Sequence, residues 1–290
     1  MTVPTLEFTI LGCGSSGGVP RIDGEWGACD PANPLNRRRR CALLVRRHGP
    51  DGVTTVVVDT GPDLREQLIA ARVTHVDAVL YTHAHADHLH GIDDLRGLAL
   101  RNRRRVDVYM DAATAERAHE GFGYCFHTPH GSFYPPILTD HRIHAGDRIV
   151  VDGAGGQIEA TAFRQHHGEI DALGFRFGGL AYSSDLNDLP AESLPLLEGL
   201  EVWVVDALRY ASHGSHFTVA QALEWIGRLK PRRAILTNLH FDLDFATLAA
   251  QLPPGVEPAY DGLVVEAGAA NLHPGPHKAE DALGAHGEPA

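Results

Sequence analysis

The sequence THAHADH, residues 82–88, decides the fold of this 290-residue chain. It places three histidines and one aspartate in the pattern H-x-H-x-D-H, directly after the apolar run Val76–Tyr81, which has the length and β-branched content of a central strand. Side chains alternate along an extended segment, so the first two histidines face the same side. A following turn toward a helix brings the aspartate and the third histidine in from another direction. Such convergence suits zinc or a comparable divalent ion, and the alternative is a histidine-rich surface loop.

This motif resembles the metal-binding signature of the metallo-β-lactamase superfamily. The segments Asp59–Arg65, Gly91–Arg96 and Asp206–Arg209 resemble the phosphodiesterase branch that includes the phosphoribosyl cyclic phosphate phosphodiesterase of phosphonate catabolism. The resemblance extends from about Leu11 to Val265. It implies an α/β (α+β) fold, a four-layer αββα sandwich with the metal site at one edge of two facing sheets. We expect a hydrolase domain over residues 1–270 and a disordered tail over 271–290.

The hydrophobic pattern predicts the elements from which such a sandwich is built. Strands are expected over residues 6–11, 41–47, 53–58, 76–81, 106–110, 149–151, 157–163, 173–177, 180–183, 201–205, 234–237 and 263–266. Helices are expected over residues 63–71, 93–100, 112–120 and 219–229. The glycine-rich loop Gly12–Gly18 either offers N–H groups to an anion or forms a turn that needs positive φ. The stretch Gly121–Pro136 either covers a substrate or packs on the surface.

Composition restricts the classes of partner. The chain has 25 Lys and Arg against 37 Asp and Glu, a formal net charge of −12, which argues against a nucleic-acid duplex or an anionic membrane bound by bulk charge. The four cysteines are widely spaced without a C-x-x-C pair, which is typical of reduced thiols in a cytoplasmic protein. We see no signal peptide and no run of 18 apolar residues. A homodimer is compatible with this composition.

The resemblance implies ligands beyond the first motif, each after a predicted strand. In relatives, the histidine directly before a glycine at the end of a strand is a ligand, which selects His167 over His166. Asp185 resembles the family's bridging aspartate, with a helix-capping role as the alternative. Many relatives have the final histidine ligand at the position of Asn238, and His240 is the only imidazole on that segment, so the last ligand is assigned to it.

The implied centre therefore contains two divalent ions, with zinc favoured by the imidazole-rich set and manganese as the alternative. The first ion is assigned to His83, His85 and His167. The second ion is assigned to Asp87, His88 and His240, and Asp185 bridges the two. Asp59, at the end of a strand, either accepts a hydrogen bond from a ligating histidine or caps the helix that follows. Relatives often carry clustered cysteines that bind a structural zinc, whereas this chain has only Cys29 in that region.

Catalytic and substrate-binding roles follow from the same resemblance. His216, two residues before Thr218, is the first candidate to protonate a leaving group, and His213 is the second. Asp87 is expected to orient a hydroxide as well as to bind metal. The run Arg37–Arg40 is either a solvated face or a source of phosphate contacts. Arg39 and Arg209 are the candidate phosphate ligands.

The expected function is hydrolysis of a small or cyclic phosphodiester. Two ions can lower the pKa of a shared water and clamp the attacking and leaving oxygens. A thioester or lactone hydrolase is the alternative on the same fold. A tRNA 3′-end endonuclease would need an RNA-binding arm that we do not find and a different net charge. A non-catalytic metal-binding accessory protein of cofactor biosynthesis is the alternative from another class.

Overall fold

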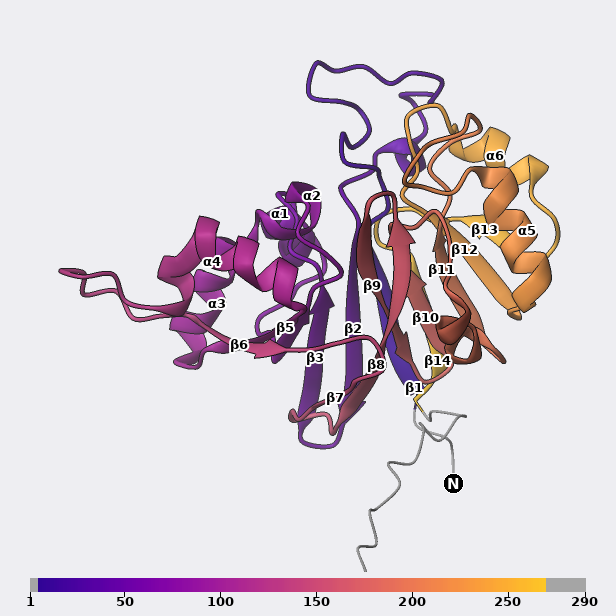
Figure 1. The fold of residues 1–290 in the computed structure, drawn as a ribbon. Coiled ribbons are helices and arrows are strands. Elements are labelled where there is room, and N and C mark those ends of the chain that lie inside the picture. Colours follow the sequence, from indigo (N-terminus) through magenta and orange to yellow (C-terminus); the bar gives the residue numbers. More distant parts are fainter. Residues whose placement is uncertain (1–4, 270–290) are drawn as a thin grey trace, which may run out of the picture.

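Two seven-stranded sheets face one another in the computed structural model, which describes residues 5–269 (Figure 1). The first sheet has the order β14-β1-β2-β3-β4-β5-β6 and the second has the order β13-β12-β11-β10-β9-β8-β7. In the first sheet, β14 to β3 pair antiparallel and β3 to β6 pair parallel. The second sheet repeats this division, with β10 to β13 parallel and β7 to β10 antiparallel.

The elements have the following bounds. The strands of the first sheet are β1 (Thr5–Gly12), β2 (Ala42–Gly49), β3 (Gly52–Val58), β4 (Ala78–Leu80), β5 (Val106–Met110), β6 (Leu138–Arg142) and β14 (Val264–Gly268). Those of the second sheet are β7 (Arg148–Val151), β8 (Ile158–His167), β9 (Ile170–Phe177), β10 (Leu180–Ser183), β11 (Val202–Asp206), β12 (Arg233–Thr237) and β13 (Val256–Pro258). The α-helices are α1 (Leu64–Ala70), α2 (Ala86–Leu89), α3 (Leu95–Asn102), α4 (Ala112–Phe126), α5 (Val219–Leu229) and α6 (Phe245–Gln251). Short 3-10 helices are η1 (Pro34–Asn36), η2 (Ile92–Asp94) and η3 (Ala191–Leu197).

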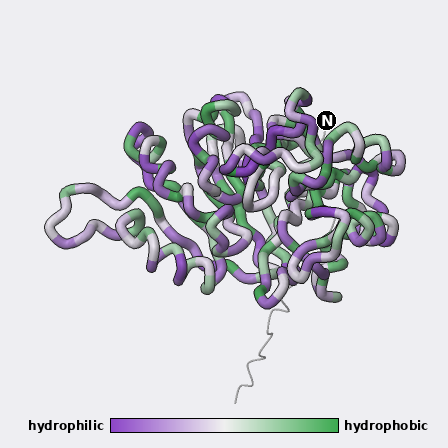
Figure 2. Tube along the Cα trace, turned by 90° about the horizontal axis from the view of Figure 1, so that it is seen from above, coloured by the Kyte–Doolittle hydropathy of each residue, from purple (hydrophilic) through white to green (hydrophobic). Residues whose placement is uncertain are grey.

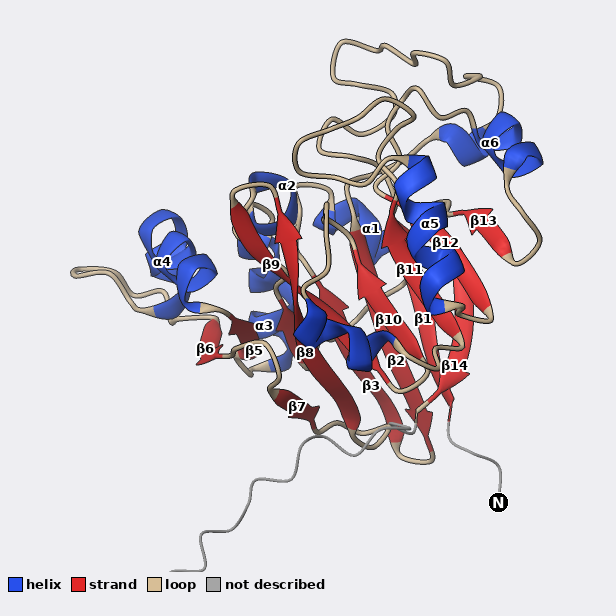
Figure 3. Cartoon of the chain, turned by 45° about the vertical axis from the view of Figure 1, so that its right-hand side comes forward, coloured by secondary structure: helices blue, strands red, loops and turns tan. Residues whose placement is uncertain are grey.

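Three buried clusters hold the layers together. The inner cluster lies between the sheets, where Phe8 of β1 meets Phe177 of β9 with ring centroids 5.9 Å apart. A second cluster packs α1, α3 and α4 against the outer face of the first sheet, and a third packs α5 and α6 against the second sheet (Figure 3). Alternation along the strands supplies the two faces, because successive side chains point to opposite sides. The predicted αββα sandwich is thereby confirmed.

Most hydrophobic segments run through the body of the molecule, whereas many rim loops are hydrophilic (Figure 2). One loop protrudes from the body after α4 (Figures 1 and 2). Its residue Phe133 is fully exposed. Helix α4 itself continues to Phe126 instead of ending at Glu120, with a kink at Phe122. The protruding residues 127–136 do not line the cavity described below, so the structure gives no support to a substrate-covering role for them.

The sequence-based prediction omitted β6 and β13, and for α6 it identified only Asp242 and Asp244 as acids at a helix start, without giving the helix bounds. Strand β6 reads LTDHR, a mostly polar segment without alternation, and it pairs only with β5 at the sheet edge. Helix α6 is seven residues long and is capped by Asp244, whose side chain accepts from the backbone N–H of Thr247. All four cysteines are free and buried. Among residues 5–269, no helix has both the length and the apolar character needed to cross a membrane. The predicted tail, 271–290, lies outside the described residues.

Candidate metal centre

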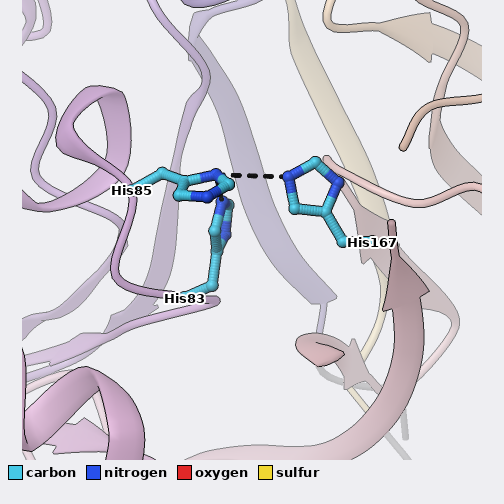
Figure 4. A group of neighbouring side chains, drawn as sticks. All are labelled: His83, His85 and His167. Atoms are coloured by element: carbon cyan, nitrogen blue, oxygen red, sulfur yellow. Dashed lines mark hydrogen bonds between the residues drawn. The ribbon is translucent and has the colours of Figure 1, made fainter. Parts of the chain in front are cut away.

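Three histidines from two separate segments of the chain point their ring nitrogens at one another (Figure 4). His83 and His85 follow β4, and His167 is the last residue of β8. Nε2 of His83 lies 2.9 Å from Nδ1 of His85, which in turn lies 3.2 Å from Nε2 of His167. Burial, assisted by the neighbouring His88, lowers the pKa of His83 well below its usual value. Burial also lowers the pKa of His167. Both rings are therefore held in the neutral form that binds metal ions.

The turn at Asp59 holds the motif 82–88 in place. Asp59 is fully buried, has a φ of 65° and accepts three hydrogen bonds: from the backbone N–H and hydroxyl of Thr82 at 2.8 Å each, and from Nδ1 of His88 at 2.7 Å. Because Nδ1 of His88 donates to Asp59, Nε2 is left to face the centre. This is the contact that a supporting role for Asp59 requires. The N-cap residue of α1 is Asp63, not Asp59.

A second group of imidazoles and carboxylates surrounds the buried Asp185, which follows β10. Its Oδ1 atom lies 3.2 Å from Nε2 of His88, and its Oδ2 atom lies 3.9 Å from Nε2 of His167. Asp87 approaches the same imidazole, with Oδ2 3.4 Å from Nε2 of His88. Burial raises the pKa of Asp185, but the charge of His88 beside it outweighs this effect, and the pKa lies well below its usual value. An ionised carboxylate thus lies between two groups of imidazoles.

His216 and Asp206 form a buried pair beside this carboxylate. Nδ1 of His216 lies 2.7 Å from Oδ2 of Asp206 and 3.9 Å from Oδ2 of Asp185. Burial raises the pKa of Asp206 to about 7 against the opposing effect of His216. Burial lowers the pKa of His216, but the hydrogen bond and charge of Asp206 raise it above its usual value. His213, the other candidate, is exposed, with its ring centroid 5.0 Å from that of His216.

The donor set fits divalent ions. The ligand atoms of three groups lie within 4.8 Å of one another: His83, His85 and His167; His83, His88 and Asp185; and His167, Asp185 and His216. Asp185 Oδ1 is buried and accepts no hydrogen bond from the described residues, although an imidazole nitrogen faces it. Buried imidazoles and carboxylates that face one another without donors between them are the usual environment of zinc, and manganese accepts the same ligands.

His240 lies outside these groups, which differs from its assignment to the second ion. Its Nε2 atom is 2.7 Å from Nη2 of Arg21, and its Nδ1 atom is 2.9 Å from Oδ2 of Asp242. The reason is the backbone at Asn238, where a φ of 60° redirects the chain after β12. The Asn238 amide lies 3.1 Å from Nδ1 of His216. The third imidazole close to Asp185 is therefore His216.

Arg39 is also placed differently from its predicted role. Its Nε atom is 2.9 Å from Oδ2 of Asp261, and the side chain does not line the cavity beside the metal centre. Its neighbour Arg40 pairs with Asp63 at 3.1 Å. Arg38 is buried and donates to the carbonyl of Leu243 at 2.7 Å. Through these contacts, Arg38, Arg39 and Arg40 hold neighbouring loops together. Cys29 belongs to none of the metal-ligand groups among residues 5–269.

A cavity of about 450 Å³ opens onto the centre. Its lining combines candidate ligands with residues from three other segments, 15–21, 208–216 and 238–240, most of which are polar or cationic: Ser15, Ser16, Gly17, Arg21, His85, Asp87, His167, Asp185, Leu208, Arg209, His213, Ser215, His216, Asn238 and His240. Arg21 was not named from the sequence. Asp206 was named only as part of the segment Asp206–Arg209, and Asn238 only as the position of the final ligand in relatives, so neither had a role of its own. The Asp206–His216 contact joins the end of β11 to the segment before α5.

Comparison with known proteins agrees with this architecture. The model of the β-lactamase superfamily domain matches residues 54–241. A crystal structure described as a new diphosphatase from the PhnP family is 32% identical, with a TM-score of 0.82, and the alignment covers 92% of this chain and 98% of that one. Zn²⁺-bound PqqB from Methylobacterium extorquens has the same fold at 16% identity, with a TM-score of 0.67 and coverage of 89% and 99%.

A curated relative from Porphyromonas gingivalis, named octanoyltransferase, is 30% identical over 263 residues. That alignment covers 89% of this chain but only 51% of the relative, so the chain spans about half the length of this curated relative. The family model covers more than half of the present chain, and the diphosphatase matches over nearly its whole length. The chain therefore belongs to the β-lactamase superfamily, has the metallo-β-lactamase fold, and resembles the PhnP family within it.

Proposed function

We propose that this protein is a metal-dependent hydrolase that cleaves a phosphodiester of a small molecule. The observation that carries the proposal is one cavity that joins an imidazole–carboxylate cluster to two guanidinium groups, those of Arg21 and Arg209. Hydrolysis of a phosphodiester requires an activated water and positive charge around the anionic oxygens. The 32% identical relative described as a diphosphatase supports cleavage of a phosphate compound.

The candidate ligands would hold two divalent ions. His83, His85 and His167 would hold one ion, Asp87 and His88 would contribute to the other, and Asp185 lies between the two groups. Zinc suits the imidazole-rich set, and manganese is the alternative. Bound divalent ions supply Lewis acidity and lower the pKa of water toward neutrality.

The chain's own groups would position the substrate and move protons. Asp87 lines the cavity beside His88 and can orient the attacking water through its carboxylate. His216 has one ring nitrogen held by Asp206, which fixes the ring and leaves the other nitrogen to protonate the leaving oxygen. Its raised pKa favours the protonated form that this step needs. Arg209 would offset the negative charge that remains on the phosphoryl oxygens.

The test is hydrolysis of bis(p-nitrophenyl) phosphate beside a lactone and a thioester, with metal content determined on the same sample. We expect chelator-sensitive diester cleavage at about two metal equivalents per chain. The partial match to a protein named octanoyltransferase keeps a thioester hydrolase as the second candidate. Cleavage of the thioester or lactone alone would favour that candidate. No turnover of any ester would favour a metal-binding accessory protein.

A further inference from the structure

The side of the molecule that carries α1, α3 and α4 gathers exposed apolar side chains (Figures 1 and 3). Among residues 5–269, nine large apolar or aromatic side chains are exposed, and five of them belong to these helices or to the protruding loop after α4: Ile69, Leu100, Tyr124, Phe133 and Tyr134. We call this surface the α3 face and define it as α1, α3, the last turn of α4 and residues 127–137. Apolar groups that gather on one surface, unlike single exposed ones, mark binding sites.

Three surface cavities are neighbours around α3. One of about 530 Å³ lies between α1 and α3 and is lined mainly by leucine, isoleucine and valine side chains. Another of about 360 Å³ lies between the end of α3 and residues 135–137, and a third of about 310 Å³ lies between α3, α4 and the protruding loop. Leu100 lines the first and the second, and Arg96 lines the first and the third. No residue of these cavities lines the cavity at the metal centre.

The α3 face is basic, although the chain as a whole has a net charge of −12. Residues 95–106 contain five arginines and no acidic residue. Arg104 has carboxylate partners, but Arg101, Arg103 and Arg105 are exposed and form no ion pair among residues 5–269. The end of a helix favours positive charge, which accounts for arginine at the last turn of α3. It does not account for Arg105, which directly precedes β5.

This combination of groups determines the kind of partner that fits. Tyrosine and arginine around apolar cavities are the composition of protein–protein binding sites, and unpaired charges of one sign select a partner of the other sign. A net charge of −12 opposes a long polyanion such as a nucleic acid or an anionic membrane, whereas a short acidic segment responds to the local charge.

We propose that the α3 face binds another protein through a segment that carries carboxylates beside apolar side chains. The apolar side chains of that segment enter the cavity between α1 and α3, and its carboxylates meet Arg101, Arg103 and Arg105. Because the α3 face shares no residue with the cavity at the metal centre, this binding is separate from the proposed hydrolysis.

The experiment uses a fluorescein-labelled peptide of Glu-Glu-Leu-Leu repeats as the probe and the full, metal-loaded chain as the receptor. Fluorescence anisotropy measures Kd for this peptide and for two control peptides, one with Gln in place of Glu and one with Ser in place of Leu. Poly(U) RNA and vesicles that contain phosphatidylserine are compared with the peptide at the same salt concentration.

Four variants locate the binding. One combines Arg101→Gln, Arg103→Gln and Arg105→Gln, the second replaces the same three residues by Lys, and the third is Leu100→Ser. Arg232→Gln is the matched control, because Arg232 is also exposed and without an ion pair among the described residues but lies outside the α3 face, just before β12. Thermal melting checks that each variant is folded.

Wild type is expected to bind the Glu-Glu-Leu-Leu peptide more tightly than either control peptide, and added salt should weaken the binding. Loss of three exposed charges should raise Kd roughly 10-fold in the Gln variant. The Lys variant should retain most of the affinity, Leu100→Ser should weaken binding, and Arg232→Gln should match wild type. The Lys variant and Leu100→Ser keep the test decisive if the Gln variant melts early.

Three results would overturn the proposal. The first is equal binding of all three peptides by wild type. The second is an unchanged Kd in both the Gln variant and Leu100→Ser, which would place the bound peptide elsewhere on the chain. The third is tighter binding of poly(U) or of the vesicles than of the peptide, with the same dependence on the three arginines, which would assign the α3 face to a polyanion. None of these results bears on the phosphodiesterase proposal, which the hydrolysis of bis(p-nitrophenyl) phosphate tests separately.

Discussion

Oδ2 of Asp206 accepts a hydrogen bond from Nδ1 of His216 across 2.7 Å, and the aspartate is fully buried while the histidine reaches the cavity. The carboxylate has few other hydrogen-bond partners, because its Oδ1 atom has none among the described residues. The pair therefore behaves as one unit, in which the aspartate fixes both the orientation and the tautomer of the ring.

Replacing His216 by alanine should lower kcat for the diester roughly 100-fold or more, since general acid catalysis contributes at least that much. Asp206→Asn should act in the same direction but more weakly. Both variants should retain metal, which elemental analysis of the purified proteins would check. Unchanged turnover would transfer the acid role to His213. A loss of one metal equivalent in His216→Ala would instead identify His216 as a ligand.

Asp185→Ala should lose metal at one or both positions, because the Asp185 carboxylate lies between the imidazoles of His88 and His167. Asp185→Asn keeps the shape but not the charge and should weaken binding less. The measurement is metal content after dialysis against a weak chelator. Retention of two equivalents by the alanine variant would refute the bridging assignment.

Gly91→Ala should disturb the metal centre although Gly91 is not a ligand. A Cβ atom there would meet the backbone oxygen of Gly61 at 2.1 Å, where the turn after β3 supports the motif 82–88. Overpacking should cost about 1–3 kcal/mol of stability and loosen metal binding. Gly97→Ala is the control, because no atom lies within 4 Å of its Cβ position and alanine favours the helix. Equal behaviour of the two variants in melting and metal titration would contradict the close-contact argument.

Removal of metal with a chelator should abolish turnover and lower the melting temperature. An ion present at about 100 times its Kd contributes about 2.7 kcal/mol to the free energy of unfolding. For a chain of this size, that corresponds to a fall of roughly 4–5 °C. Differential scanning calorimetry before and after chelation, and after return of zinc or manganese, would measure the change. A melting temperature independent of metal would argue against ligation by the buried imidazoles.

The N-cap of α6 should make stability depend on pH in the acid range. Asp244 accepts from Thr247 N at 2.9 Å and from Asn36 Nδ2 at 2.7 Å. Burial raises its pKa, but these hydrogen bonds outweigh burial and lower the pKa to about 2. A lowered native pKa means that the contribution is complete above the unfolded value, about 3.9, and is lost as the pH falls toward 2.

Asp244→Ala should therefore cost about 1 kcal/mol at pH 7, and the difference from wild type should shrink between pH 4 and pH 2. Urea unfolding of both proteins at pH 7, 4 and 3 would measure it. Asp94→Ala is a suitable control, since Asp94 precedes α3 without a side-chain cap bond. A difference that stays constant with pH would show that the carboxylate charge is not involved.

The sequence predicted the layered fold because apolar runs of strand length and glycine-marked turns report directly on burial. The motif 82–88 also identified His83 and His85, and the resemblance to the superfamily added His167 and Asp185; the structure brings these four residues together at one edge of the sheets. Local hydrophobic pattern carries the information on strands. Polar edge strands such as β6 carry little of it, which is why that element was not predicted.

The positions of His240, Arg39 and Arg21 depend on distant contacts. His240 faces Arg21, 219 residues earlier in the chain, and Arg39 is neutralised by Asp261, 222 residues later. The spacing of residues within one segment cannot predict partners that lie more than 200 residues away in the chain. Arg21 lies in an irregular loop without periodicity, and only its place just after the glycine-rich loop could have suggested a role.

The candidate ligands are divided between the two sheets: His83, His85, Asp87 and His88 follow a strand of the first, and His167 and Asp185 come from the second. An ion shared between these sets would act as a cross-link across the sandwich, in addition to the apolar packing and hydrogen bonds between the sheets. A chain cut in the protruding loop after α4 would yield two fragments, neither with a full ligand set. Their reassociation would then depend on metal concentration, and metal uptake would become a late step of assembly.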